Sequence, residues 1–328
     1  MSVSERFHAV CDGRAVDRLP MVEWASWWDQ AIARWHGEGL PAGDRYAINR
    51  HFGLDHWHQT WTCALNWECP WKAPHHGAGV LGVAPSYDAV EPYVGAWRID
   101  RDGLRHGFAM QQAGEAAVWL TLPGFFWGAR DILGIERHLM AFHDEPELLH
   151  RINDRLAAWM LRCLDEIDGL GRIDFVTFAE DLSYNHGPML SKKSFDAVLL
   201  PYYRRVVPAL RARGIRVLVD SDGDITRCAP WFAAAGVEGI LPLERQAGVD
   251  IDVLQRDHPA MTFVGHFDKM TMPQGEAAMR AEFERLLPAM RRGRFIPSVD
   301  HQTPPGVSLV QYRDYVRLLG EYARHAVT

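Results

Sequence analysis

The sequence contains few cysteines, and their spacing suits neither a disulfide scaffold nor a structural metal site. The five residues, Cys11, Cys63, Cys69, Cys163 and Cys228, are scattered along the chain, and no two of them form a CxxC pair. A disulfide framework and a cysteine-bound structural zinc are therefore not expected. The first ten residues, MSVSERFHAV, lack the apolar stretch and cleavage site of a signal peptide, so we expect a cytoplasmic protein.

Other absences narrow the range of functions. The 328 residues include 35 basic and 42 acidic side chains, and this net charge of −7 has the wrong sign for a general binder of nucleic acid or anionic membranes. No apolar run approaches the roughly 18 residues of a membrane span. GxGxxG, Walker and GxSxG motifs are missing, which argues against a nucleotide loop and a serine-hydrolase elbow. Because no linker divides the chain, we expect residues 1–328 to form one domain.

Tryptophan, in contrast, is abundant. The chain has 13 tryptophans. Eight of them fall between residues 24 and 71, at positions 24, 27, 28, 35, 57, 61, 67 and 71. An unusually aromatic core and an aromatic binding surface both explain such a cluster. The sequence alone does not separate these two interpretations for residues 35 to 71.

The pattern of apolar residues predicts a TIM barrel. From residue 115 onward, short β-branched and aromatic runs alternate with longer stretches of helical periodicity, which is typical of βα units. We expect strands at residues 19–24, 116–122, 174–178, 216–219, 239–243, 261–264 and 295–299, with an eighth near 57–65. A short N-terminal helix precedes them. We expect residues 90–114, with a turn at Gly103, to form a β-hairpin excursion above the barrel.

Acidic residues and histidines follow five successive predicted strands. They are Glu180 and Asp181, Asp220 and Asp222, Glu244, His266 and Asp268, and Asp300 and His301. The carboxyl ends of parallel barrel strands form one face, where active sites lie, so we expect these side chains to converge there. Converging carboxylates raise one another's pKa values, which makes this face the predicted functional site. We expect structural roles for His51, His56, His58, His75 and His76, which have no partner at metal-ligand spacing.

Five ordered motifs in the second half carry a family resemblance. They are FAEDLSYNHGPMLSKKSF, GIRVLVDSDGDI, AGVEGILPLE, FVGHFDK and FIPSVDHQTPPGVS, and the opening DRLPMVEW agrees with them. Together they resemble the uroporphyrinogen decarboxylase superfamily of TIM barrels, which also contains methyltransferases that act with corrinoid proteins and coenzyme M. The resemblance implies that the protein is an enzyme with a small-molecule substrate and that it forms a homodimer.

The sequence departs from the superfamily's decarboxylases at the first predicted strand. Where they carry an arginine-rich segment that holds porphyrinogen carboxylates, this chain reads VEWASWWDQAIARW. Indoles cannot clamp carboxylates as guanidinium groups do. We therefore expect Trp24, Trp27 and Trp28 to form an aromatic box for a different substrate. His301 does fall where the decarboxylases keep a histidine.

A second departure concerns zinc. The methyltransferase branch typically binds zinc through a His-x-Cys pair and a later cysteine, but the corresponding positions here are Asp220, Asp222 and the Asp300–His301 pair. Carboxylates do not reproduce the preference of thiolates for this metal. We therefore do not expect thiolate-ligated zinc, and the sequence leaves open whether a harder divalent ion binds.

The resemblance and these departures lead to a preferred hypothesis of methyl transfer. A small O- or N-methylated compound would lose its methyl group to a separate corrinoid protein, because this chain shows no corrinoid-binding domain. We expect catalytic residues at Asp181, Asp220, Asp222, His266 and His301. We expect substrate contacts from Trp24, Trp27, Trp28, Glu180, Tyr184, Glu244 and Asp268.

Two alternatives remain. The first is a cofactor-independent decarboxylase, a lyase that acts on a small aromatic or heterocyclic carboxylate, with Asp222 or His301 as the proton donor. The second is a non-catalytic binding protein on the same barrel, because one fold hosts many functions.

Overall fold

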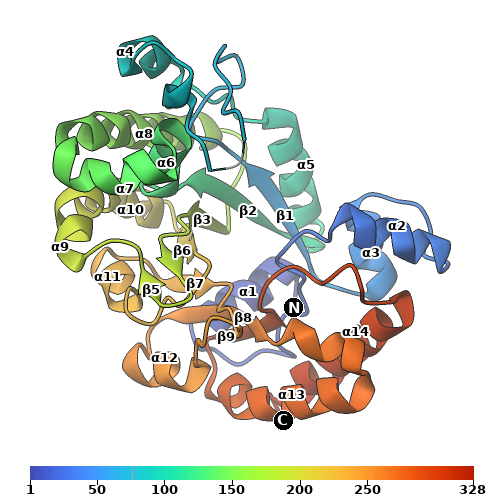
Figure 1. The fold of residues 1–328 in the computed structure, drawn as a ribbon. Helices are drawn as coiled ribbons and strands as arrows, with labels where there is room; N and C mark the ends of the chain where they lie inside the picture. The colour runs from blue at the N-terminus through green and yellow to red at the C-terminus, as the bar shows by residue number, and fades with distance from the viewer. Residues whose placement is uncertain (76) are drawn as a thin grey trace.

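Seven parallel strands form the curved wall at the centre of the molecule. The computed structural model describes residues 1–75 and 77–328, so His76 lies outside the described residues. The strands run in the order β1 (His56–Trp61), β2 (Ala116–Pro123), β3 (Phe175–Ala179), β6 (Arg216–Asp220), β7 (Gly239–Leu241), β8 (Thr262–Phe267) and β9 (Phe295–Val299) (Figure 1). The expected strand near 57–65 is therefore present as β1.

Residues 19–24 occupy the remaining position of the barrel without forming a regular strand. The Asp55 amide donates to the Met21 carbonyl at 2.7 Å, and Ser298 Oγ donates to the Val22 carbonyl at 2.7 Å. This extended segment therefore bridges the start of β1 and the edge of β9. The expected strand at 19–24 is wrong in detail, because the Met21 amide donates to the Asp55 carboxylate at 2.9 Å rather than to a neighbouring strand.

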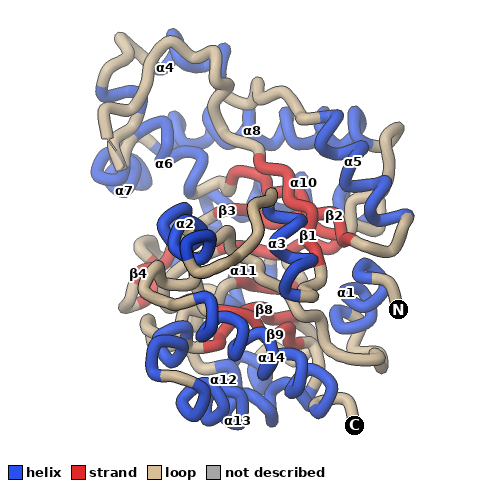
Figure 2. Tube along the Cα trace, turned by 90° about the vertical axis from the view of Figure 1, so that its right-hand side faces the viewer, coloured by secondary structure: helices blue, strands red, loops and turns tan. Residues whose placement is uncertain are grey.

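Helices pack around this wall (Figure 2). In chain order they are α1 (Val3–Cys11), α2 (Asp29–Gly37), α3 (Arg45–Phe52), α4 (Tyr87–Val90), α5 (Arg101–Gln112), α6 (Trp127–Leu133), α7 (Ile135–Asp144), α8 (Pro146–Ile167), α9 (Lys192–Ser194), α10 (Leu200–Ala212), α11 (Ala229–Ala234), α12 (Ile251–Asp257), α13 (Glu276–Arg292) and α14 (Leu309–His325). Shorter helical turns are η1 (Val80–Gly82), η2 (Glu91–Tyr93), η3 (Phe195–Leu199) and η4 (Lys269–Gln274). None of the helices in the described residues is long and apolar enough to cross a membrane.

The expected β-hairpin at residues 90–114 is wrong, because this segment contains η2 and the amphipathic helix α5. The Asp100 carboxylate caps the helix by accepting from the Gly103 amide at 2.9 Å, so Gly103 lies in the first turn and not in a hairpin loop. Leu104 and Phe108 are buried at helical spacing. A two-stranded hairpin does occur elsewhere, between β4 (Ser183–Tyr184) and β5 (Gly187–Pro188).

The clustered tryptophans divide between core and surface. Trp35 and Trp57 are 0% and 2% exposed, and Trp57 packs in the core beside the stacked rings of Trp119 and Phe175. Trp67, in contrast, is 62% exposed. The core interpretation therefore holds for Trp35 and Trp57, whereas Trp67 lies on the surface.

Candidate active site

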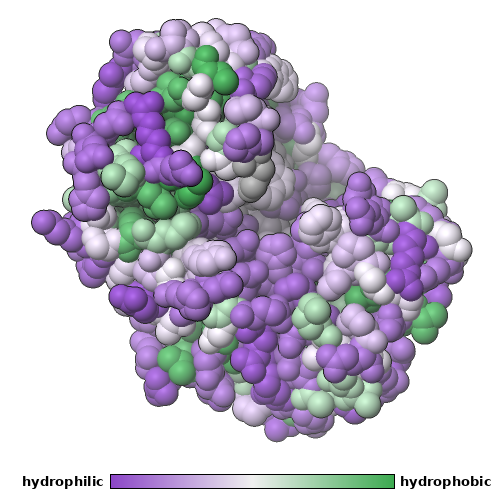
Figure 3. All heavy atoms as spheres, viewed as in Figure 1, coloured by the Kyte–Doolittle hydropathy of each residue, from purple (hydrophilic) through white to green (hydrophobic). Residues whose placement is uncertain are grey.

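A cavity of about 300 Å³ lies at the carboxyl ends of the strands. The residues that line it are Trp24, Ala25, Ser26, Gln59, Trp61, Trp119, Trp127, Ala179, Asp181, Asp220, Asp222, His301 and Gln302. They come from the ends of β1, β3, β6 and β9, from within β2 and from the adjoining segments. Figure 3 shows this side of the molecule hollowed between the part that carries α4 and the part that carries α2 and α3. The cavity has an acidic side and an indole side.

The acidic side consists of three aspartates. Asp181, Asp220 and Asp222 each offer a carboxylate oxygen, and these oxygens lie within 4.8 Å of one another. The Asp222 amide donates to Asp181 Oδ1 at 3.1 Å. Asp181 has a φ of +40°, a conformation that residues other than glycine rarely adopt and that often marks functional sites. In the described residues, no group donates a hydrogen bond to the Asp220 carboxylate, which lines the cavity.

Proximity and burial change the protonation of these acids. Burial and the neighbouring Asp222 raise the pKa of Asp181 to about 7. Burial and the charges of Asp181, Asp222 and Glu244 raise the pKa of Asp220 well above its usual range. Asp220 therefore binds its proton more tightly than an exposed aspartate does and is a candidate general acid.

His301 completes the acidic side. Its Nε2 lies 3.4 Å from Asp222 Oδ2, and this pairing raises the pKa of His301 against the opposing effect of burial. Glu244 lies next to this pair and accepts from the Gly223 amide at 2.8 Å. The imidazole edge also contacts Trp24, with ring centroids 6.1 Å apart. His301 thus links the acids to the indoles and is a candidate for proton transfer.

Two overlapping groups could hold a cation. Asp222, Glu244 and His301 form one, and the three aspartates form the other. Both offer carboxylate oxygen or imidazole nitrogen, and neither contains a thiol in the described part of the chain. This donor chemistry suits a hard divalent ion and does not fit a thiolate-ligated zinc site.

Four tryptophans form the indole side. Trp24 is fixed by a hydrogen bond from its Nε1 to the Val299 carbonyl at 2.8 Å. Trp119 donates to Thr177 Oγ1 at 2.8 Å, and Trp127 donates to Asp131 Oδ2 at 3.0 Å. The Arg130 guanidinium lies 3.4 Å from the centroid of the Trp127 ring. The fourth, Trp61, is 53% exposed at the cavity mouth.

Sequence reasoning missed Trp119 and Trp127 because they lie outside the N-terminal cluster. It also missed Gln59 and Gln302, which line the same cavity. One signal was available: Trp119 lies two residues before Thr121 in the buried strand β2, so both face the same side. That alternation does not say which side is the inside of the barrel.

Two of the three tryptophans expected in the aromatic box lie elsewhere, and only Trp24 lines the cavity. Trp27 is 6% exposed and packs edge-on against Trp35 and Tyr312, with centroids 6.1 and 6.0 Å apart. Trp28 is 45% exposed and directly precedes α2. The chain turns away from the cavity after Ser26, so Trp27 enters the core and Trp28 faces outward.

Two other expected site residues are fully buried and engaged in the fold. Glu180 accepts from the Phe125 and Phe126 amides at 2.9 and 2.7 Å, and so holds the start of α6. His266 Nδ1 lies 3.1 Å from the Leu243 carbonyl. Burial lowers the pKa of His266 to about 4. The structure does not bring these two residues into the cavity.

Three further expected residues are not among those that line the cavity. Asp268 caps η4 and accepts from Gln246 at 2.7 Å. Tyr184 is 64% exposed on β4. Asp300 is buried, and Lys269 Nζ donates to it at 3.1 Å. Their charges and hydroxyl groups lie outside the cavity lining.

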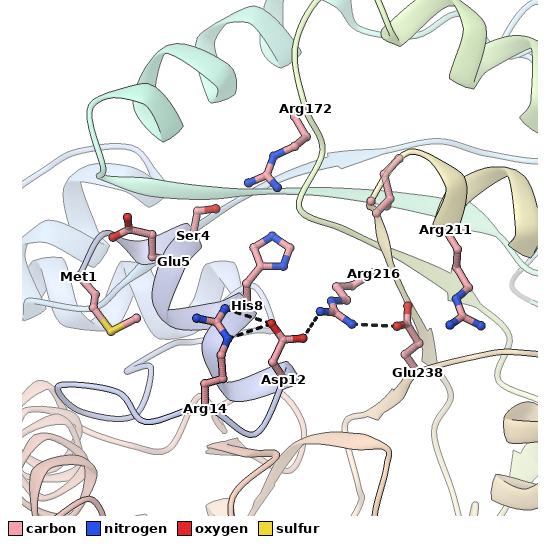
Figure 4. A pocket seen from close by; sticks show the side chains of 12 residues that line it. Met1, Ser4, Glu5, His8, Asp12, Arg14, Arg172, Arg211, Arg216 and Glu238 are labelled. Carbon is pink, nitrogen blue, oxygen red and sulfur yellow. Dashed lines mark hydrogen bonds and ion pairs between the residues drawn. The ribbon is translucent and has the colours of Figure 1, made fainter.

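A larger cavity, of about 730 Å³, lies at the opposite end of the barrel. Its lining includes Asp12 and Arg14, which follow α1, Arg216 at the start of β6, and Glu238 directly before β7. Figure 4 shows that these four side chains form a chain of ion pairs. Because these four charges pair with one another and the amino-terminal face of such barrels usually serves stability, we place the candidate site at the smaller cavity.

The strand order and the position of the cavity define the class of protein: a TIM barrel whose candidate site lies at the carboxyl ends of its strands. A family model for uroporphyrinogen decarboxylase (URO-D) matches residues 126–322, which is more than half of the chain. The protein belongs to this family.

One of two similar solved structures supports the fold. A methyltransferase from Methanosarcina mazei matches with a TM-score of 0.68 and 14% identity, over 98% of this chain and 99% of that one. A Listeria monocytogenes protein described as a vitamin-B12-independent methionine synthase matches with a TM-score of 0.48 and 10% identity, over 94% and 96% of the two chains. The first likeness shows a shared fold. No curated protein sequence matches this chain.

Proposed function

We propose that the protein removes a methyl group from a small O- or N-methylated compound and transfers it to a corrinoid carried by a partner protein. One observation carries this proposal: several indole rings line the same cavity as Asp220, an aspartate whose pKa is raised by burial and by the neighbouring acids. Indole faces bind aromatic ethers and methylated ammonium groups, and each good cation–π contact contributes about 0.5 to 2 kcal/mol.

The electrostatics of the cavity favour a substrate without many carboxylates. Among the described residues, no arginine or lysine lines the cavity. Three aspartates do line it, namely Asp181, Asp220 and Asp222. A porphyrinogen carries several carboxylates, and the lining residues offer them no guanidinium, because Arg130 stacks on Trp127 and interacts electrostatically with Asp181 and Asp222. The volume of about 300 Å³ lies at the lower end for ligand pockets and suits a single ring at the reacting end.

Each side of the cavity has a separate task in this reaction. The indoles of Trp24, Trp119 and Trp127 hold the substrate and exclude water. As the C–O bond of a methyl ether breaks, Asp220 donates a proton to the departing oxygen, which then leaves as a neutral alcohol. A methylated ammonium group leaves as a neutral amine and needs no proton. The Asp222–His301 pair lies beside Asp220 and can return the proton. The corrinoid supplies the nucleophile that accepts the methyl group.

The test uses the purified protein with cob(I)alamin and a panel of methoxyaromatic compounds and methylamines. Formation of methylcobalamin is followed by absorbance, and Met140→Ala, an exposed residue on α7 outside the cavity, serves as the control variant. Methylcobalamin formation with at least one compound supports the proposal, and none with any compound contradicts it. Release of CO₂ from pyrrole or indole carboxylates without cobalamin would instead indicate the decarboxylase. Binding without either reaction would indicate a binding protein.

A further inference from the structure

A second groove, of about 620 Å³, adjoins the candidate site. Its walls include Trp61, Trp67 and Trp97. Gln59 and Trp61 line both this groove and the acidic cavity, so the two spaces are neighbours separated by Trp61. A ligand whose reacting end lies against the aspartates can therefore extend past Trp61 into the groove.

The outer wall of this groove is preformed. The segments around Leu65 and Val94 pair through an antiparallel bridge, and the Asn66 amide donates to the Tyr93 carbonyl at 2.9 Å. Asn66 Nδ2 also donates to the Ala96 carbonyl at 2.9 Å. These bonds hold the two segments together immediately before the two tryptophans. A ligand there would lose less binding energy to ordering of the wall.

Trp67 and Trp97, which directly follow these bonded residues, form an aromatic corner, in which the two rings meet edge to face. Their ring centroids are 6.1 Å apart with an interplanar angle of 65°. The Trp97 carbonyl accepts from Trp159 Nε1 at 3.0 Å, which ties the corner to α8. Trp67 is 62% exposed and Trp61 is 53% exposed. Such exposed aromatic surface next to a cavity marks a binding site.

The polar groups of the groove favour a neutral ligand. Arg98 pairs with Glu68 at 3.2 Å, and the Asp100 carboxylate accepts from the Gly103 amide. His58 Nε2 lies 2.9 Å from the Gly103 carbonyl, and burial lowers the pKa of His58. In the described residues, the Nε1 groups of the three groove tryptophans make no hydrogen bond with the protein, so they can donate to oxygen substituents on a ring.

We propose that the groove formed by Trp61, Trp67 and Trp97 is a second binding subsite, which takes a neutral aromatic ring of the ligand. The ligand of this protein then carries two linked rings, with the methylated ring in the acidic cavity and the distal ring between the exposed indoles. The assignment of the methylated ring rests on the proposed function, whereas the affinity for a distal ring does not.

The test compares one-ring and two-ring ligands by calorimetry, without cobalamin. The probes are 4-methoxyphenol and 1-benzyloxy-4-methoxybenzene. We expect the two-ring compound to bind the native protein about tenfold more tightly, since a well-placed aromatic contact and its buried surface contribute that much. Trp67→Ala should lose most of this gain and keep its affinity for the one-ring compound. Trp67→Phe should retain part of the gain, and Met140→Ala should retain all of it.

Several results would overturn the subsite. These are equal affinity of the native protein for both probes, an undiminished gain in Trp67→Ala, or no binding of either probe. An equal gain from 4-methoxyphenyl glucoside would show that the groove takes a sugar ring instead. Thermal unfolding of Trp67→Ala controls for the fold, and the exposure of Trp67 predicts little change. If the two-ring gain depends on Trp67 but no compound yields methylcobalamin, the proposed function fails and the subsite stands.

Discussion

The two ends of the barrel use the same residue type in opposite ways. At the amino-terminal end, the buried Asp174 carboxylate accepts hydrogen bonds from Gln111 at 2.6 Å and the Val118 amide at 2.7 Å, and pairs with His8 at 2.9 Å. At the carboxyl-terminal end, Asp181 and Asp220 face other carboxylates. Asp174 is thus provided with several donors, whereas Asp181 accepts from the Asp222 amide and, among the described residues, no group donates to the Asp220 carboxylate.

The pKa values of the aspartates shift in opposite directions at the two ends. Although burial alone would raise it, hydrogen bonds from His8, Ser4, the Val118 amide and Gln111 hold the pKa of Asp174 below its usual range. The pKa values of Asp181 and Asp220 move the other way. Ionised Asp174 therefore stabilises the folded state at the amino-terminal end. Ionisation of Asp181 and Asp220 destabilises it at the carboxyl-terminal end, where we place the reaction.

Asp220→Asn, at the carboxyl-terminal end, should have the largest effect of the variants considered. An amide cannot supply the proton, so we expect the rate of methyl transfer to fall about 10²- to 10⁴-fold. The free energy of unfolding should stay the same or rise, because a buried acid next to other acids is removed. Methylcobalamin absorbance measures the first and urea unfolding the second. A fully active variant would show that Asp220 is not the acid.

Asp174→Ala tests the other end. This substitution leaves the Val118 amide, Gln111 and His8 without their acceptor, so we expect a loss of about 3 kcal/mol in the free energy of unfolding. Activity per folded molecule should not change, because Asp174 lies at the end of the barrel opposite the cavity. Urea unfolding measures the loss. A loss below about 0.5 kcal/mol, as for an ordinary surface change, would contradict the structural role of this network.

The sequence predicted this barrel and the core of its acidic side for a physical reason. Parallel strands are buried on both faces, so they appear as apolar runs, and the polar residues that follow them at Asp181, Asp220, Asp222 and His301 meet in one cavity. Glu180 and Asp181 show the limit of this reasoning. They are adjacent in the chain, but one holds α6 and the other lines the cavity, and only the backbone turn at Asp181 separates their roles.

The tryptophans and residues 90–114 mark a second limit. Trp24, Trp27 and Trp28 are chemically alike, and their separation into cavity, core and surface depends on the direction of the chain after Ser26. The helix α5 was predictable in part, because Asp100 three residues before Gly103 is a capping signal and the apolar spacing that follows is helical. Gly103 pointed the other way, because glycine is common in the turns of β-hairpins.

The pH dependence of stability should separate the two ends with a smaller effect. Asp181 binds a proton more tightly in the folded state, so its contribution to stability is present near pH 4 and is lost as the pH rises towards 7. The raised pKa of His301 acts in the same direction at higher pH. The lowered pKa of Asp174 has the opposite sign, so its contribution is lost as the pH falls below about 4.

Urea unfolding at a series of pH values tests this prediction. We expect Asp181→Asn to flatten the decline between pH 4 and 7 by an amount on the order of 1 kcal/mol, since the acids share their protons and are partly solvated. Asp174→Ala should flatten the acid side instead. Equal flattening on both sides by either variant would contradict the assignment of opposite roles to the two ends.

The smallest effect is expected within the amino-terminal end, from Arg14→Gln. Arg14 is 61% exposed in its pair with Asp12, whereas Arg216 is 27% exposed and pairs with both Asp12 and Glu238. Exposed ion pairs contribute about 0 to 1 kcal/mol, so Arg14→Gln should lower the free energy of unfolding by less than 1 kcal/mol, and salt should reduce the loss further. Arg216→Gln should cost more, because it leaves Glu238 without its cation and leaves Asp12 with only the exposed Arg14. If urea unfolding gives the two variants equal losses, the ion pairs of this end stabilise the fold by their number rather than by their depth in the protein.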